Sequence, residues 1–209
     1  LGAAVSSGDV VGIAGTHGKT TTTVMTTTAL RSAGLDPTGI AGGRVAEWDG
    51  NMSFGSDRLF VVEADEYDRS FLALDPAIAV VTNVEADHLD IYTDLADIRA
   101  TFSRYVSGAR AIVLCADDSG ANSLELPATA EVIRYGLNSP DARLVARDVR
   151  PVDGGSTFAV FYDGERKCEV TLRVPGIHNV RNALAAIGSG LALGVEPVQM
   201  VDGLAEFPG

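Results

Sequence analysis

The sequence has 209 residues, 46% of them hydrophobic, which is enough to bury a sizeable core. Its formal net charge of −12 argues against a nucleic-acid-binding surface, which needs clustered Lys and Arg. No apolar run approaches the roughly 18 residues of a membrane span, and no signal peptide pattern opens the chain. The two cysteines lack metal or redox spacing. We interpret them as reduced thiols and expect a cytoplasmic protein.

The first half of the sequence alternates short apolar runs with helical patterns. Residues 10–14 form an apolar run that ends next to a glycine, and residues 18–33 predict a helix closed by Gly34. Further buried strands are expected at residues 59–63, 78–83 and 111–115, and a further helix at residues 96–106. This alternation predicts an α/β fold with a doubly wound, mostly parallel sheet flanked by helices.

The pattern changes between residues 131 and 174. Short β-branched and aromatic segments there predict antiparallel strands at residues 144–149, 157–162 and 168–174, with Asp163 and Gly164 as a hairpin turn. Residues 179–193 predict an Ala-rich helix closed by Gly194, and residues 197–207 predict another. We therefore expect one domain over residues 1–209, with a small antiparallel sub-sheet beside the parallel one.

Polar residues follow three of the expected strands at their carboxyl ends, and ligands bind at that edge of a doubly wound sheet. The segment from Gly15 to Thr20, G-T-H-G-K-T, lies there between an expected strand and an expected helix. Its glycines let backbone N–H groups face an anion, and the helix N-terminus adds a positive dipole. Lys19 is then expected to reach the β- and γ-phosphates of a nucleotide, and Thr20 to offer its hydroxyl to Mg²⁺.

The phosphate-loop motif is imperfect, because the common pattern G-x-x-x-x-G-K-[ST] requires glycine where Ile13 stands. Two observations favour it nevertheless. The segment has the strand-to-helix context that the motif needs, and Lys19 is one of only two lysines, with Lys167, in the whole chain. We interpret the segment as a triphosphate-binding loop.

The segment A-G-T-H-G-K-T-T-T-T at residues 14–23 resembles the Mur ligase family. Three more segments match that family in the same order, namely E-A-D-E-Y-D at 63–68, T-N-V-E-A-D-H at 82–88 and P-G-I-H-N-V-R-N at 175–182. The resemblance covers essentially the whole chain. It implies the central, ATP-binding domain of a three-domain ligase, with the N-terminal UDP-sugar domain and the C-terminal domain absent from this sequence.

The resemblance also implies roles for individual residues. The implied catalytic residues are Lys19, Glu63 and His88, and the implied metal-site residues are Thr20, Glu63 and His88. The implied nucleotide-binding residues are Gly15, Thr16, His17, Gly18, Lys19, Thr20, Thr21, His178, Asn179 and Asn182. Asn179 and Asn182 are three residues apart at a helix start, hence on one face, and an amide offers the donor and acceptor that an adenine edge requires.

The metal site is the least regular part of this assignment. Mg²⁺ prefers oxygen ligands, so a direct bond from His88 is unusual, and Mn²⁺ or a bridging water would ease it. Several members of the family hold a second metal with a carbamylated lysine after the D-H pair, but no lysine lies between His88 and Arg110. A lysine-borne carbamate is therefore excluded, which strengthens the assignment of His88 as a metal-site residue. A neighbouring charged cluster fits a solvated loop as well as a substrate-facing role: Asp65, Glu66, Asp68 and Arg69.

The implied reaction belongs to peptidoglycan precursor synthesis. The γ-phosphoryl group of ATP passes to the lactyl carboxylate of UDP-N-acetylmuramate, and the amino group of L-alanine attacks the acyl phosphate. Two alternatives stay open, namely a sister activity that attaches a tripeptide to the same sugar and an ATP-binding module without ligase chemistry. The stretch at residues 71–76, free of extra basic residues, favours the alanine reaction. Both substrates are expected to bind mostly through the missing domains, with no nucleic acid or membrane partner.

Overall fold

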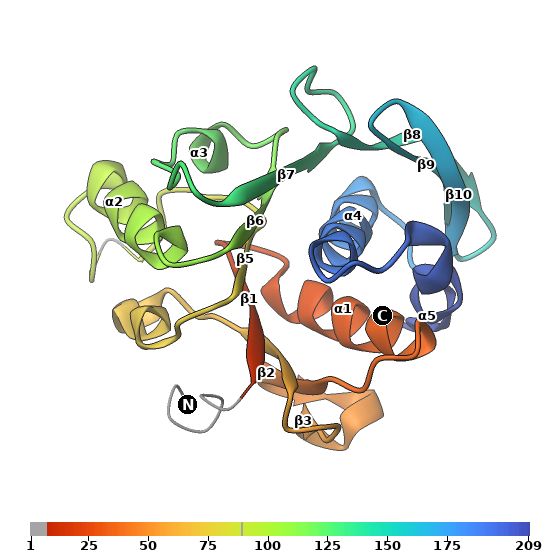
Figure 1. Ribbon diagram of the computed structural model, residues 1–209, viewed down its shortest axis with the longest axis horizontal. Helices are drawn as coiled ribbons and strands as arrows, with labels where there is room; N and C mark the ends of the chain where they lie inside the picture. The colour runs from red at the N-terminus through yellow and green to blue at the C-terminus, as the bar shows by residue number, and fades with distance from the viewer. Residues whose placement is uncertain (1–7, 89) are drawn as a thin grey trace.

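The computed structural model describes residues 8–88 and 90–209, which form one large curved sheet with helices on both faces (Figure 1). The first seven residues of the expected domain lie outside this description. The strands are β1 (Asp9–Ala14), β2 (Thr38–Val45), β3 (Gly50–Ser53), β4 (Leu59–Glu63), β5 (Ile78–Val81), β6 (Ala111–Cys115), β7 (Glu131–Gly136), β8 (Leu144–Val152), β9 (Gly155–Tyr162) and β10 (Glu165–Leu172). They are ordered β10-β9-β8-β7-β6-β5-β1-β4-β2-β3, which confirms the predicted fold class.

Among the described residues, the helices keep the expected positions with small shifts at their ends, except for the short helix Ser119–Asn122, which was not predicted. They are α1 (Lys19–Ser32), α2 (Leu95–Val106), α3 (Ser119–Asn122), α4 (Ile177–Ala192) and α5 (Val201–Glu206), with 3-10 turns η2 (Ala46–Trp48), η3 (Tyr67–Ala73) and η4 (Pro197–Met200). The helix expected at residues 197–207 is thus a 3-10 turn that runs directly into α5. At the start of α2 the side chain of Asp94 accepts a hydrogen bond from the backbone N–H of Asp97, as an N-cap should.

The middle of the sheet is parallel and places three strand ends side by side. Strand β1 pairs with β4 on one side, where Ile13 lies opposite Glu63, and with β5 on the other, where Ala14 lies opposite Val81. These strands are short apolar runs because both of their faces are covered. The polar residues that follow β1, β4 and β5 therefore converge at one edge, as predicted.

The antiparallel part continues the main sheet. Strands β8, β9 and β10 pair antiparallel, and Asp163 and Gly164 form the β9–β10 turn with positive φ angles of 51° and 82°. Strand β8 also pairs in parallel with β7, where Tyr135 lies opposite Leu144. Figure 1 shows this end of the sheet curling over α4 and α5. Strands β2, β3 and β7 were not predicted from the sequence.

The two faces of the sheet bury two separate hydrophobic cores. Helices α1, α4 and α5 cover one face, and α2, α3 and η3 cover the other (Figure 1). Both cysteines are free, with Cys115 buried and Cys168 partly buried. None of the helices formed by residues 8–88 and 90–209 combines the length and apolar character needed to cross a bilayer.

Candidate nucleotide-binding site

The connection from β1 to α1 needs glycine at two positions. Gly15 and Gly18 have φ angles of 141° and 82°, which side chains disfavour. A Cβ atom on Gly15 would collide with the hydroxyl of Thr82, and one on Gly18 would lie 2.7 Å from the side-chain oxygen of Asn182. The loop backbone therefore packs tightly between the end of β5 and the first turns of α4.

The residues after β5 hold this loop in place. The backbone N–H of Thr16 donates to the carbonyl of Asn83 at 3.1 Å, and that of His17 donates to Asn83 Oδ1 at 2.8 Å. The carbonyl of His17 accepts from Thr82 Oγ1 at 2.8 Å and from Asn83 Nδ2 at 3.1 Å. These hydrogen bonds fix the loop against the segment that follows β5.

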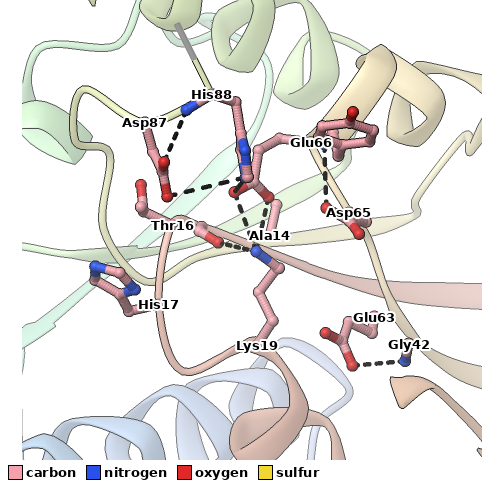
Figure 2. Close-up of polar contacts among 12 residues, drawn as sticks. Ala14, Thr16, His17, Lys19, Gly42, Glu63, Asp65, Glu66, Asp87 and His88 are labelled. Carbon is pink, nitrogen blue, oxygen red and sulfur yellow. Dashed lines mark hydrogen bonds and ion pairs between the residues drawn. The ribbon is translucent and has the colours of Figure 1, made fainter. Parts of the chain in front are cut away.

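Lys19 lies at the first position of α1 and points across the loop. Its ammonium Nζ donates to the carbonyl of Gly15 at 2.8 Å and to Glu66 Oε1 at 3.0 Å, and lies 2.9 Å from Glu66 Oε2 (Figure 2). The Lys19 side chain is 13% exposed, and that of Glu66 only 4%. The charged end of the lysine is thus held at the strand-end edge of the sheet.

Thr20 and Glu63 form the neighbouring pair. The hydroxyl of Thr20 lies 3.0 and 2.9 Å from the two carboxylate oxygens of Glu63, and Glu63 also accepts the backbone N–H of Gly42 at 2.7 Å. Figure 2 shows Glu63 turned toward Gly42 at the base of the site. A hydroxyl beside a carboxylate supplies two of the oxygen ligands that Mg²⁺ prefers.

His88 lies beside Glu66 and Asp87 at this edge of the sheet. Its Nε2 lies 3.9 Å from Glu66 Oε1 and 3.9 Å from Asp87 Oδ2, both longer than a hydrogen bond, and its ring packs edge-on against Tyr67. Among residues 8–88 and 90–209, no group of three His, Cys, Asp or Glu side chains is arranged to hold a metal alone. A metal at this edge would therefore need further oxygen ligands, which the phosphates of a nucleotide supply.

A cavity of about 490 Å³ opens between the loop and the start of α4. Its volume is within the range of small-molecule sites. Six of the predicted nucleotide-binding residues line it: His17, Gly18, Thr21, His178, Asn179 and Asn182. Asn179 donates to the carbonyl of Pro175 at 2.8 Å, and Asn182, largely buried, donates to Asn179 Oδ1 at 3.4 Å. The two amides thus share one face of α4, as their spacing predicted.

Other cavity residues were not predicted. Thr82, Asn83, Tyr135 and Arg181 also line it. Thr82 and Asn83 follow β5 directly and belong to the polar strand ends that were expected to converge, although no nucleotide-binding role was assigned to them. Arg181 gives no comparable signal, because its partner is 64 residues away: its Nε lies 3.2 Å from Asp117 Oδ2.

Asp117 also accepts backbone N–H groups from Leu137, Asn138 and Ser139. Burial opposes the charged form of this carboxylate and would raise its pKa, but the three N–H groups and Arg181 together lower the pKa of Asp117 below its ordinary 3.8. One carboxylate thus ties the end of β6 to the segment after β7 and to the cavity-lining side of α4.

A glycine loop between a parallel strand and a helix, a lysine at the helix start and an adjoining cavity define an α/β nucleotide-binding domain of the P-loop type. The family comparison is more specific: residues 13–190 match the profile of the Mur ligase middle domain. The chain therefore belongs to the Mur ligase family.

Relatives place the chain within that family. It is 43% identical over 202 residues to the UDP-N-acetylmuramate–L-alanine ligase of Salinibacter ruber, covering 95% of this chain and 42% of that protein. The fold matches UDP-N-acetylmuramate–alanine ligase from Thermotoga maritima, with a TM-score of 0.84, 28% identity, and 97% of this chain against 45% of that one. It matches equally well, at 0.84 and 29% identity, a Neisseria ligase named for joining UDP-N-acetylmuramate to a tripeptide, covering 98% of this chain and 68% of that one.

Proposed function

We propose that this chain is the ATP- and Mg²⁺-binding middle domain of a ligase that joins L-alanine to UDP-N-acetylmuramate. The observation that carries the proposal is the convergence of Lys19, Thr20 and Glu63 at one strand-end site beside a nucleotide-sized cavity. Because the chain spans less than half the length of the Salinibacter relative, the UDP-sugar and the amino acid are assigned mostly to flanking domains. A cytoplasmic location belongs to the same proposal, since the reaction consumes ATP.

The nucleotide is proposed to lie along the loop with its adenosine in the cavity. His178, Asn179 and Asn182 line the cavity from α4. Beyond its bonds within the chain, each of the two amides keeps a second N–H and a further acceptor position that the base can use. The phosphates then follow the loop, which comprises Gly15, Thr16, His17, Gly18, Lys19, Thr20 and Thr21. The N–H groups of Thr16 and His17 are donated to Asn83, so the backbone N–H groups at the start of α1 are the ones proposed to face the α- and β-phosphates, while Lys19 reaches the terminal phosphates.

Phosphoryl transfer requires mainly positioning and charge neutralisation from this domain. A bound Mg²⁺, or Mn²⁺, supplies Lewis-acid stabilisation of the transferring phosphoryl group. Thr20 and Glu63 are the residues proposed to hold it, with His88 on the far side of the site. Lys19 neutralises charge at the γ-phosphate as it passes to the lactyl carboxylate. The resulting acyl phosphate has the good leaving group that attack by the L-alanine amine needs.

The tripeptide-adding activity is the strongest alternative, because the fold matches ligases of both kinds equally. The relatives matched by sequence distinguish the two activities better than the fold does. Relatives at 43% and 41% identity, in Salinibacter ruber and Syntrophotalea carbinolica, are both named UDP-N-acetylmuramate–L-alanine ligases. Supplying alanine or the tripeptide as acceptor to the longer protein distinguishes the two activities directly.

The test is ligation by the longer protein that contains this domain. Lys19→Ala should lower kcat/KM for ATP by about 100-fold or more, because a charged donor to the transferring group is lost. Lys167→Ala is the matched control, since that lysine is paired with Glu165 away from the site and should leave ligation unchanged. Phosphate release that ignores UDP-N-acetylmuramate would instead favour an ATP-binding module without ligase chemistry.

A second expectation concerns the 209-residue chain alone. It should bind nucleotide yet form little or no UDP-N-acetylmuramoyl-alanine, because the proposed sites for both other substrates lie outside it. Robust product formation by the isolated chain, measured by chromatography, would overturn the assignment of those substrates to flanking domains.

A further inference from the structure

Glu66 is a nearly buried carboxylate that takes no part in the chemistry proposed above. It lies between β4 and η3, and its side chain is 4% exposed. Its backbone carbonyl accepts the hydroxyl of Tyr92 at 2.6 Å and the N–H of Arg69 at 3.0 Å, which fixes the position of the residue. Burying a charged carboxylate is unfavourable unless a partner compensates it. The placement of Glu66 therefore depends on a nearby cation.

That cation is Lys19. Its ammonium lies 3.0 and 2.9 Å from the two Glu66 oxygens and 2.8 Å from the carbonyl of Gly15 (Figure 2). An ammonium has three N–H donors. At least two of them point at acceptors of the chain itself, so Lys19 is held and its charge is offset.

A triphosphate on this loop would need the same ammonium. Carboxylate and phosphate oxygens are both anionic, and two anions around one partly buried cation repel each other. Binding must therefore draw Lys19 away from Glu66, at least in part. His88 Nε2 also lies near this carboxylate, 3.9 Å from Glu66 Oε1, which is too far for a hydrogen bond in the present arrangement.

We propose that Glu66 is a positioning residue that holds Lys19 across the phosphate loop and competes with nucleotide phosphates for its ammonium group. This inference rests on the proposed ATP site. It means that nucleotide binds more weakly than it would to an unpaired lysine, and that the Lys19–Glu66 pair re-forms when the nucleotide leaves.

Nucleotide binding to Glu66→Gln tests the proposal. Glutamine keeps the shape and one acceptor oxygen but removes the competing charge. The Kd values for Mg²⁺ with ADP, or with a non-hydrolysable ATP analogue, should fall roughly 10-fold, the size expected for one charged hydrogen bond. AMP, which lacks the phosphates that Lys19 reaches, should bind as in the wild type. Isothermal titration calorimetry measures all three ligands.

Asp65→Asn is the matched control. It removes one negative charge from the adjacent position, where the exposed Asp65 side chain accepts only the N–H of Tyr67 among the bonds seen in the described residues. It should leave the three affinities unchanged. An equal gain in the control would show a general electrostatic effect and would overturn the specific role of Glu66.

Lysine labelling tests the pair without nucleotide. With only two lysines in the chain, acylation by a small amine-reactive ester can be followed separately at Lys19 and Lys167 by peptide mass spectrometry. Glu66→Gln should raise the rate at Lys19 several-fold and leave Lys167 unchanged. Should Glu66→Gln fold poorly, Glu66→Asp, which withdraws the carboxylate by one methylene, should show the same increase to a smaller degree.

The outcomes separate the two proposals. Wild-type nucleotide binding with no change in affinity or in Lys19 labelling for Glu66→Gln would overturn the role of Glu66 and leave the proposed function standing. Failure of the wild-type chain to bind nucleotide at all would overturn both.

Discussion

Gly15 shows at the scale of single residues why the phosphate loop depends on the absence of a side chain. Its φ of 141° and its contact with Thr82 are both incompatible with a Cβ atom. Gly15→Ala should therefore cost about 1–3 kcal/mol of folding free energy and weaken nucleotide binding at the same time. Urea unfolding and calorimetric titration of the variant measure the two effects.

Gly43→Ala is the control for that change. Gly43 lies in the exposed part of β2, and a Cβ atom there would meet nothing within 4 Å. The free energy of unfolding of the Gly43→Ala variant should stay within roughly 0.5 kcal/mol of the wild type, as for ordinary surface substitutions. Equal losses in both variants would contradict the account of the loop.

The sequence carries unequal information about the site residues. Lys19 and Thr20 could be predicted because a local motif, strand-glycine-helix, contains all of the physical requirements. The position of Glu63 at this edge followed from its place at a strand end, whereas its metal-binding role was implied only by the family resemblance. Glu66 could not be assigned, because the feature that matters is its pairing with a lysine 47 residues away, and a run of acidic residues is equally compatible with a solvated loop.

At the scale of secondary structure, the many threonines of helix α1 are unexpected for a stable buried helix. Threonine is a mediocre helix former, and four of these side chains are buried against the sheet and α4. Among the described residues, Thr27 donates to the carbonyl of Thr23 at 2.8 Å, whereas the hydroxyl of Thr26 has no partner. A buried hydroxyl without a partner is destabilising.

Adjacent substitutions in α1 should therefore have opposite effects. Thr26→Val replaces an unpaired hydroxyl with a methyl group and should raise the melting temperature by about 2–4 °C, equivalent to about 1 kcal/mol. Thr27→Val removes a formed hydrogen bond and should lower it. Differential scanning calorimetry decides the matter, and a loss of stability in Thr26→Val would show that the hydroxyl is satisfied in solution.

Asp117 links three elements and gives the stability a defined pH dependence. Because its folded-state pKa is lowered, the carboxylate stabilises the protein above the unfolded pKa, and that contribution is lost as the pH falls through the folded value. Asp117→Asn should cost about 2–3 kcal/mol at pH 7. The difference from the wild type should shrink below about pH 4. Urea unfolding at several pH values measures the difference in unfolding free energy between the two proteins. A difference that stays constant as the pH falls would contradict the role of the Asp117 charge.

The unpredicted strands lack the patterns by which strands are recognised. Strand β2, T-G-I-A-G-G-R-V, contains three glycines, and β3 has only four residues. Strand β7, E-V-I-R-Y-G, mixes charged and apolar residues, so its sequence shows neither a continuous apolar run nor a regular alternation. All three are defined by pairing with neighbours, which becomes visible only in the assembled sheet.

At the scale of the whole molecule, the strand order explains how an acidic chain can hold an anion. The net charge of −12 is spread over the protein, whereas the loop concentrates backbone N–H groups, a helix start and Lys19 at one edge. That edge exists because β1 lies between β4 and β5, so three segments far apart in the sequence end together. The alternation of strands and helices was sufficient to predict this convergence.

A crystal structure of the chain with Mg²⁺ and a non-hydrolysable ATP analogue tests the central claim most directly. The account predicts the terminal phosphates within hydrogen-bond distance of Lys19, the metal bound by Thr20 and Glu63, and the adenine beside Asn179 and Asn182. Phosphates bound away from the loop that begins at Gly15, or a metal held without Thr20 and Glu63, would contradict it.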